Sequence, residues 1–449
     1  MAFWNWVTQD LVLPLSDLFL GRSISKHLRF LQESQWWSAQ ELKEYQNEKL
    51  RALIKHAYTN VPYYHNLFNE NKLTPEDIKT TDDLTKLPLL TKEIIRKNFP
   101  HNIAAKNIPT KQMMLLGSSG STGEPLQYYT TKDAYSFNVA CALRGWSWTG
   151  FRLGDKYVKI SQNPRQGLIN KIQDKIHRCE YVHSQSLTPE NITDIVQTIR
   201  KSKAKLIRGY PSTLYVLSGY IKQKGIDDIK PTAVTTTGEI LFPNMRKLIE
   251  SQFHCRVFDA YSGEAGANIS ECETHETYHA SAEYAFTELI NDEGQKIQTE
   301  GRGEVVSTNL WNYAFPFIRY NVKDVAVLEN RKCSCARGLP VLAKIEGRDS
   351  DILITPSGKR LIVHYFTGYF EWVDTVKQFQ VTQKTTNRIT LKLVPNDKFN
   401  NEAKSKIYND ISRYIGNDVR LEIEIVDDIP LTRSGKRRFV ISELGPQPA

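Results

Sequence analysis

The chain has 449 residues, about three times the ~150 residues typical of one domain, so two or three hydrophobic cores are expected. A hydrophobic content of 40%, an aromatic content of 10% and a mean hydropathy of -0.45 exclude disordered, collagen-like, coiled-coil and multi-span membrane proteins. The formal net charge is +9. Because the basic residues are scattered along the chain, we expect anionic ligands or surfaces as partners and not nucleic acid.

Residues 4–19 place apolar side chains at roughly helical spacing. Asp10 and Asp17 interrupt this run, which is far shorter than the ~20 apolar residues needed to cross a bilayer. Two interpretations remain open: the segment docks on its own domain as an amphipathic helix, or Trp4 and Trp6 hold residues 1–20 at a membrane interface. We find no secretory signal and therefore expect a cytoplasmic protein, peripheral at the inner face of the membrane under the second interpretation.

Residues 38–56 are predicted to form a helix, because Ser38 and Glu41 have the spacing of a capping box and apolar residues follow on one face. Residues 61–64, Val-Pro-Tyr-Tyr, are predicted to end it. From about residue 84 to 346, short β-rich runs alternate with helical patterns, which predicts an α/β fold. Strands are predicted at residues 157–160, 206–208, 233–237, 257–260 and 303–308, and helices at 189–201, 211–224 and 243–252.

The pattern changes after Gly347. Two hairpin-like strands are predicted at residues 379–385 and 388–394, followed by a helix at 401–415 and a strand at 419–426. We therefore expect a large domain at residues 1–346 and a separate small α+β domain at residues 347–449.

A glycine- and hydroxyl-rich loop at residues 117–125, Gly-Ser-Ser-Gly-Ser-Thr-Gly-Glu-Pro, lies between two apolar runs. Its glycines allow the backbone to approach a ligand, and its N–H and hydroxyl groups can donate to phosphate oxygens. It is not a Walker loop, because no lysine follows Gly123. An ordinary surface loop of the same composition remains the alternative.

Polar residues also follow two predicted strands, in Thr-Thr-Thr-Gly-Glu at residues 235–239 and Asp-Ala-Tyr-Ser-Gly-Glu at residues 259–264. In α/β sheets, ligands bind at these carboxyl ends, where a tyrosine can stack on a base and a carboxylate can hold a metal. Residues 316–324, 346–351 and 430–438 add further charged motifs. Taken singly, each motif is weak, because a tyrosine or aspartate at such a place is usually structural and an Arg/Lys run is usually a solvated face.

In this order and spacing, together with Glu-Ser-Gln-Trp-Trp-Ser at residues 33–38, the motifs resemble those of the adenylate-forming superfamily. The chain is most similar to the phenylacetate-CoA ligase group and the CapK-like enzymes of capsular polysaccharide biosynthesis. The resemblance covers about residues 30–444. It implies a large adenylation domain of several subdomains followed by a small, mobile domain.

The resemblance also assigns roles to the nucleotide-binding motifs. Gly238 and Glu239 would flank the adenine, and Tyr261, followed by Ser262, would stack on it. The phosphate loop would consist of Ser118, Ser119, Gly120, Ser121, Thr122 and Gly123.

Four charged residues complete the implied site. Asp324 would bind the ribose hydroxyls, and Arg348 the ribose or a phosphate. Lys436 would be the adenylation lysine. Glu264 would hold Mg²⁺, although it follows Tyr261 by three residues where the family spacing is four.

The reaction implied is the activation of a carboxylic acid by ATP, which releases pyrophosphate, followed by acyl transfer to CoA, a carrier thiol or an amine. Mg²⁺, N–H donors and a lysine suit the charge that develops on the transferring phosphorus. A non-catalytic nucleotide-binding or scaffold protein and a basic anion-binding module are the alternatives. Lys436, Asp324 and Arg348 speak against both, since a scaffold needs no adenylation lysine.

A second cluster combines a Cys-x-x-His-x-x-x-His pattern with a Cys-x-Cys pair. Four of its five residues would suffice for one tetrahedral Zn²⁺. Free thiols and loop histidines are the alternative. The five candidates are Cys272, His275, His279, Cys333 and Cys335.

Overall fold

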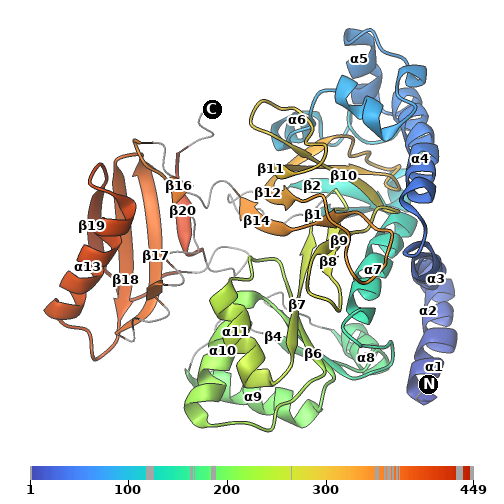
Figure 1. Cartoon of the computed structure of the whole chain (residues 1–449). Helices are drawn as coiled ribbons and strands as arrows, with labels where there is room; N and C mark the ends of the chain where they lie inside the picture. Colours follow the sequence, from blue (N-terminus) through green and yellow to red (C-terminus); the bar gives the residue numbers. More distant parts are fainter. Residues whose placement is uncertain are drawn as a thin grey trace. The chain divides into compact units, whose positions relative to one another are not determined.

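The structure is a computed structural model of the chain (Figure 1). It describes residues 3–117, 126–161, 165, 167–183, 189–263, 265–348, 353–357, 360–361, 366, 369–370, 373, 375–430 and 438–444. Contacts divide the chain into two compact units, Met1–Ile240 with Ile249–Glu346, and Leu241–Leu248 with Gly347–Ala449. The longer segment of the second unit thus begins at Gly347, where the sequence pattern changes. That these units are domains that move during function stays a prediction.

The first unit begins with a series of helices. Ser38 and Glu41 form the predicted capping box: the Ser38 hydroxyl accepts from the Glu41 N–H at 3.2 Å, and the Glu41 carboxylate accepts from the Ser38 N–H at 2.7 Å. The predicted helix is confirmed, and Pro62 occupies the first turn of the next helix. The elements are α1 (Phe3–Trp6), a π-helical stretch (Val7–Val12), α2 (Leu13–Leu20), α3 (Ile24–Ser34), α4 (Ala39–Asn60), α5 (Pro62–Glu70), α6 (Lys92–Asn98) and three 3₁₀ turns (Pro75–Asp77, Thr81–Lys86, Thr110–Gln112).

The N-terminal segment, residues 3–20, has its polar side chains buried and most of its apolar ones exposed. Asn5, Thr8 and Asp17 are buried, and Leu13 is the one large apolar side chain buried with them. The expectation that its apolar residues dock on the same domain is therefore wrong for seven side chains. These exposed residues are Phe3, Trp4, Trp6, Leu11, Leu15, Leu18 and Phe19.

An eight-stranded mixed sheet confirms the α/β prediction. Its order is β13-β9-β8-β7-β6-β5-β3-β4; the strands from β4 to β7 pair in parallel, and β8, β9 and β13 extend the sheet antiparallel. Among the described residues, no helix combines the length and apolar character of a membrane span. The elements are α7 (Lys132–Ser147), β3 (Tyr157–Ser161), α8 (Leu168–Ile176), β4 (Cys179–His183), α9 (Pro189–Ser202), β5 (Leu206–Gly209), α10 (Pro211–Lys224), β6 (Ala233–Thr237), α11 (Pro243–Phe253), β7 (Arg256–Ser262), β8 (Asn268–Glu271), β9 (Tyr278–Ala280) and β13 (Val341–Leu342).

A second sheet of the first unit has the order β10-β11-β12-β14, beside a separate hairpin of β1 and β2. Phe315, Phe317 and Tyr320 lie in one apolar core with Leu126 of the hairpin region and Ile269 of the large sheet. This core joins the three β-structures. Their strands are β1 (Met113–Gly117), β2 (Gln127–Thr131), β10 (Ala285–Ile290), β11 (Gly301–Asn309), β12 (Tyr320–Leu328) and β14 (Lys344–Arg348).

The second unit contains a four-stranded sheet of order β19-β18-β17-β20 and the helix α13 (Asn401–Ile415). Ile407, Ile411 and Ile415 form the buried stripe of α13, as the helical spacing predicts. The predicted α+β composition is confirmed. The strands are β15 (Leu353–Ile354), β16 (Arg360–Leu361), β17 (Val376–Thr385), β18 (Arg388–Pro395), β19 (Arg420–Ile425) and β20 (Val440–Ser442).

A fully buried ion pair ties α7 to the start of β10. The Arg144 guanidinium donates to both carboxylate oxygens of Glu283, at 2.7 and 3.2 Å, and to the Ser281 hydroxyl at 2.9 Å. The Ser34 hydroxyl at the end of α3 donates to the same carboxylate at 2.6 Å. Three segments distant in sequence therefore meet at Glu283.

We expect Glu283→Gln to destabilise the first unit by about 3–5 kcal/mol, because it leaves a buried guanidinium without its countercharge. The midpoint of urea or thermal unfolding measures this. Glu48→Gln is the matched control, since Glu48 is 67% exposed in its ion pair with Lys49 and should shift stability by less than about 0.5 kcal/mol. Equal midpoint shifts for the two variants would contradict the role given to the pair.

Candidate functional site

The carboxyl end of β6 presents Gly238 and Glu239. Gly238 has φ +79°, a left-handed conformation that glycine adopts without strain. The Glu239 carboxylate accepts from the backbone N–H of Ser212, in the first turn of α10, at 3.0 Å. Glu239 is therefore held at the edge of the sheet where α/β folds bind ligands.

Tyr261 and Asp324 meet across two sheets. The Tyr261 hydroxyl, near the end of β7, donates to the Asp324 carboxyl on β12 at 2.6 Å. Asp324 is 9% exposed, and the half-buried Tyr261 ring packs against the core that joins the sheets. Two of the residues predicted to hold a nucleotide are thus adjacent, although 63 positions separate them in sequence.

A polar network that the sequence analysis did not assign to the site joins strands β6, β7 and β9. The Asp259 carboxylate accepts from the Thr236 hydroxyl at 2.6 Å and from the Tyr278 hydroxyl at 3.0 Å. The Asp259 N–H donates to Glu271 at 2.8 Å. The available signal was an aspartate among the apolar residues Val257, Phe258 and Ala260 of β7, because such a carboxylate must find donors when it is buried.

The other predicted nucleotide residues are placed in part or lie outside the described residues. Ser262 ends β7, where its Cα pairs with that of Asn268. Arg348 is the last residue of β14. The predicted phosphate loop at residues 118–123 lies outside the described residues, as do Glu264 and Lys436.

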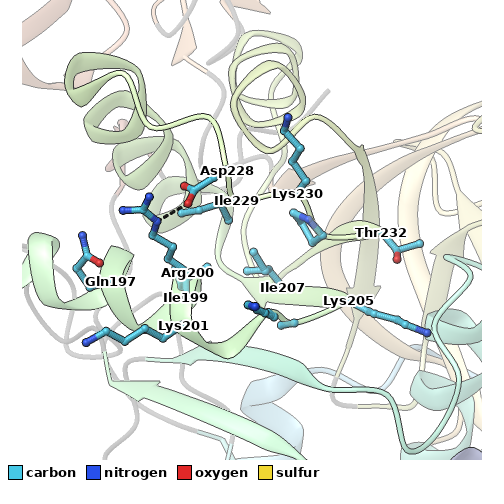
Figure 2. Close-up of a pocket in the computed structure, with 13 residues that line it drawn as sticks. Gln197, Ile199, Arg200, Lys201, Lys205, Ile207, Asp228, Ile229, Lys230 and Thr232 are labelled. Atoms are coloured by element: carbon cyan, nitrogen blue, oxygen red, sulfur yellow. Dashed lines mark hydrogen bonds and ion pairs between the residues drawn. The ribbon is translucent and has the colours of Figure 1, made fainter.

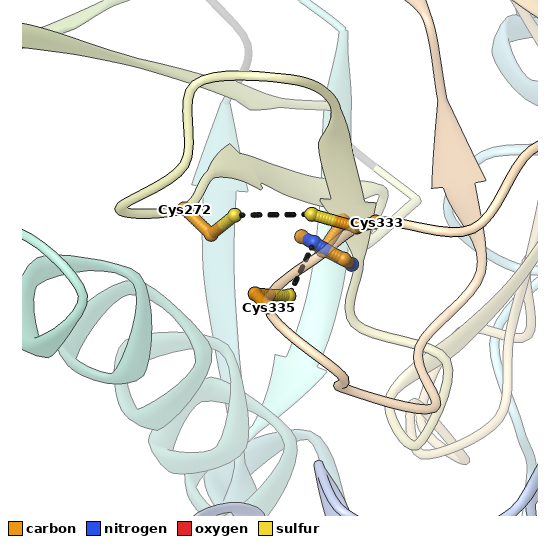
Figure 3. A group of neighbouring side chains, drawn as sticks. Cys272, Cys333 and Cys335 are labelled. Atoms are coloured by element: carbon orange, nitrogen blue, oxygen red, sulfur yellow. Dashed lines mark hydrogen bonds between the residues drawn. The ribbon is translucent and has the colours of Figure 1, made fainter.

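Four of the five candidate zinc ligands gather at one point (Figure 3). The ligand atoms of Cys272, His279, Cys333 and Cys335 all lie within 4.8 Å of one another. The sulfur atoms of Cys272 and Cys333 are 3.6 Å apart, and the Cys335 sulfur lies 3.3 Å from His279 Nε2. The cluster joins the turn after β8, strand β9 and the loop between β12 and β13.

His275 lies apart from this cluster. Its Nδ1 atom is 3.7 Å from a Glu271 carboxylate oxygen, and its ring packs on Phe258 with a centroid distance of 4.4 Å. His279, by contrast, is fully buried, and desolvation together with the charge of Arg337 lowers its pKa to about 4. At neutral pH its imidazole is therefore uncharged, which is the form that binds metals.

A cavity of about 590 Å³ opens at the opposite edge of the large sheet (Figure 2). Lys205 and Thr232, which precede β5 and β6, place it at the amino ends of these strands. Its lining is basic, with the one ion pair Arg200–Asp228 drawn in the view. Of the predicted nucleotide-binding residues that the structure describes, none lines this cavity.

Comparison with known proteins gives the chain's family. A family model of the CapK C-terminal domain matches residues 353–443. Phenylacetate-coenzyme A ligase of Pseudomonas putida is 30% identical over 330 residues, which cover 71% of this chain and 73% of that protein. The chain belongs to the phenylacetate-coenzyme A ligase family. Protein CapK of Staphylococcus aureus is 25% identical over 463 residues and is matched over 98% of this chain and 97% of its own length.

The fold is also that of solved members of the wider group. A crystal structure of 2-hydroxyisobutyryl-CoA ligase in the postadenylation state, in complex with R3-HIB-AMP, superposes with a TM-score of 0.73 at 18% identity. The match covers 92% of this chain and 93% of that one. The adenylate-forming architecture expected for a phenylacetate-coenzyme A ligase family member is thereby confirmed.

Proposed function

We propose that the protein is an ATP-dependent ligase that activates a carboxylic acid as an acyl adenylate and then transfers the acyl group to a thiol, of CoA or a carrier, or to an amine. The observation that carries this proposal is the Tyr261–Asp324 hydrogen bond of 2.6 Å at the ligand-binding edge of the sheet. Family membership supports the same chemistry. We also propose a role in capsular polysaccharide biosynthesis, which rests on the resemblance of the sequence motifs to CapK-like enzymes and is consistent with the similarity to protein CapK of Staphylococcus aureus.

The nucleotide would be held by groups on or next to four strands, β6, β7, β12 and β14, and by residues 118–123. The Asp324 carboxyl would accept hydrogen bonds from the ribose hydroxyls, and its bond to the Tyr261 hydroxyl would orient that ring for stacking on the adenine. Gly238 offers a backbone without a Cβ where the chain must approach the base. Arg348 would contact the ribose or a phosphate, and residues 118–123 would bind the phosphates.

The first step forms one bond and breaks one. A carboxylate oxygen of the substrate attacks the α-phosphorus of ATP, the bond to the bridging oxygen breaks, and pyrophosphate leaves with that electron pair. Lys436 would donate to the oxygens that gain charge, and Glu264 would bind Mg²⁺, which neutralises the phosphates. In the second step a thiolate or amine attacks the acyl carbon, and AMP leaves.

We expect pyrophosphate release from ATP that depends on a carboxylic acid. A panel of aliphatic, hydroxylated and aromatic acids, each assayed alone and with CoA or a primary amine, identifies both the acid and the acceptor. Asp324→Ala should raise the KM for ATP by ~10-fold or more, because bonds to the ribose are lost. Asp227→Ala, at an exposed carboxylate, is the control. ATP binding without acid-dependent pyrophosphate release across the panel would favour a scaffold protein.

Lys436→Ala should slow adenylation by ~10²-fold or more, the cost of one lost transition-state donor. Transfer from a supplied acyl adenylate should continue, because in that step the nucleophile attacks the acyl carbon and no bond to phosphorus forms or breaks. Lys404→Ala, an exposed lysine of α13, is the control and should leave both steps unchanged. Unaltered pyrophosphate release would refute the assignment of Lys436, and equal loss in both half-reactions would indicate a damaged second unit instead.

We further propose that Cys272, His279, Cys333 and Cys335 bind one Zn²⁺. Three sulfur ligands and one imidazole fill a tetrahedral site without an open position, so the ion would be structural. It would fasten the β8–β9 turn to the loop between β12 and β13. The distance of 3.6 Å between the Cys272 and Cys333 sulfurs leaves room for an ion bonded to both.

Protein purified without chelators should contain about one zinc per chain, measured by elemental analysis. His279→Ala should lose most of it, whereas His275→Ala should keep it, because His275 lies apart from the cluster. Retention of zinc by His279→Ala, or wild-type protein without zinc, would overturn the assignment.

A further inference from the structure

We propose that the exposed apolar side chains of residues 3–20 form a binding surface for an anionic phospholipid bilayer. This surface, the N-terminal apolar face, goes beyond the proposed ligase activity and does not depend on it. Leu18 is 82% exposed and Phe19 94% exposed. Leucine and phenylalanine side chains are usually buried. Contiguous apolar patches of this kind mark interaction sites. The face consists of Phe3, Trp4, Trp6, Leu11, Leu15, Leu18 and Phe19.

The polar side of the segment fixes it in this orientation. Asn5 donates to the Leu153 carbonyl at 2.8 Å and to the Asp155 carboxylate at 3.2 Å. Asp17 accepts from the N–H and from the hydroxyl of Ser25, each at 2.7 Å. A rotation that buried the apolar side chains would break these bonds and expose the buried Leu13. These hydrogen bonds therefore hold the segment with its apolar side chains facing outward.

The helix α8 extends the same face. Arg178, two residues past the end of α8, lies over the Trp4 ring at 5.3 Å, so α8 ends beside α1 (Figure 1). Ile172 and Ile176 on α8 are about half exposed. Lys171 and Lys175 alternate with them and are exposed. An apolar surface interleaved with lysines continues from the segment onto α8.

Charge identifies the partner as an anionic bilayer. Asp10 is the one exposed acidic side chain in residues 3–20, whereas Lys26 and Lys132 are exposed close to the end of α2, where Lys132 donates to the Leu20 carbonyl at 2.9 Å. Basic side chains around an apolar face with tryptophan are typical of proteins that lie in the headgroup region. A second copy of the chain would bring the same positive charges together, which disfavours self-association.

The basic cavity lies next to the buried polar side of the segment. Lys205, which lines the cavity, donates to Asp155 Oδ1 at 2.9 Å, and Asn5 of the segment donates to the same oxygen. The segment and the cavity are therefore adjacent at the amino edge of the large sheet. Four lysines line the cavity. They are Lys201, Lys203, Lys205 and Lys230.

Flotation with vesicles of phosphatidylcholine alone or mixed with phosphatidylglycerol tests the proposal. The wild-type chain should float with the mixed vesicles, and less at high salt, which screens the lysines. Leu18→Glu with Phe19→Glu should weaken binding by ~10-fold or more, because two apolar side chains no longer enter the bilayer. Tyr408→Glu, at a site 46% exposed on α13, is the matched control and should bind like the wild type.

Lys171→Glu with Lys175→Glu provides a second, independent variant. It alters only exposed residues of α8 and should weaken binding to the mixed vesicles without changing thermal unfolding. Equal flotation of the wild type and both variants would overturn the proposal. A wild-type dimer in sedimentation that Leu18→Glu with Phe19→Glu converts to a monomer would also overturn it, because the face would then be covered by a second copy.

Discussion

The first unit depends on the burial of one ion pair. Arg144 and Glu283 have no exposed surface, so the desolvation of both charges must be offset by the bonds between them and by those from Ser34 and Ser281. These partners come from α3, α7 and the segment before β10. The pair therefore fixes the N-terminal helices against the second sheet, and through α7, which packs on β8, it also connects them to the large sheet.

Periodicity and turn chemistry were sufficient to predict the helices and strands named in the sequence analysis, but not others such as α7, β10 and β12. The helix at Pro211–Lys224 has the bounds predicted, and the strands around residues 157, 206, 233 and 257 begin within a residue of theirs. Sequence alone did not show that β8, β9 and β13 extend the sheet antiparallel, because strand pairing depends on contacts distant in the chain. Pro62 illustrates a local ambiguity: a proline that ends one helix is equally suited to begin the next.

The cysteine–histidine cluster and the N-terminal segment show what residue types and their spacing could not predict. The spacing of Cys272, His275 and His279 admits either histidine as a ligand, and the contacts of His275 with Glu271 and Phe258 exclude it from the cluster. The apolar spacing of residues 4–19 predicted a helical segment but not its orientation. That was decided by Asn5 and Asp17, two polar residues whose partners lie outside the segment or after it. In both cases a specific polar contact overrides the hydrophobic pattern.

Different groups of residues lie at the carboxyl and amino ends of the strands of the large sheet, which are called here its carboxyl and amino edges. Tyr261, Gly238 and Glu239 stand at carboxyl ends, whereas the basic cavity and the contacts of Asn5 lie at amino ends. A bilayer bound at the amino edge would leave the nucleotide edge open to soluble ATP. Binding at one edge changes affinity at the other only if both edges favour different states of a common element. The parallel strands β3, β5 and β6 are each hydrogen-bonded to a neighbour on both sides, which disfavours a shift of one strand against the next. If the segment binds a bilayer, we therefore expect it to hold the protein at the membrane without changing the affinity for the nucleotide.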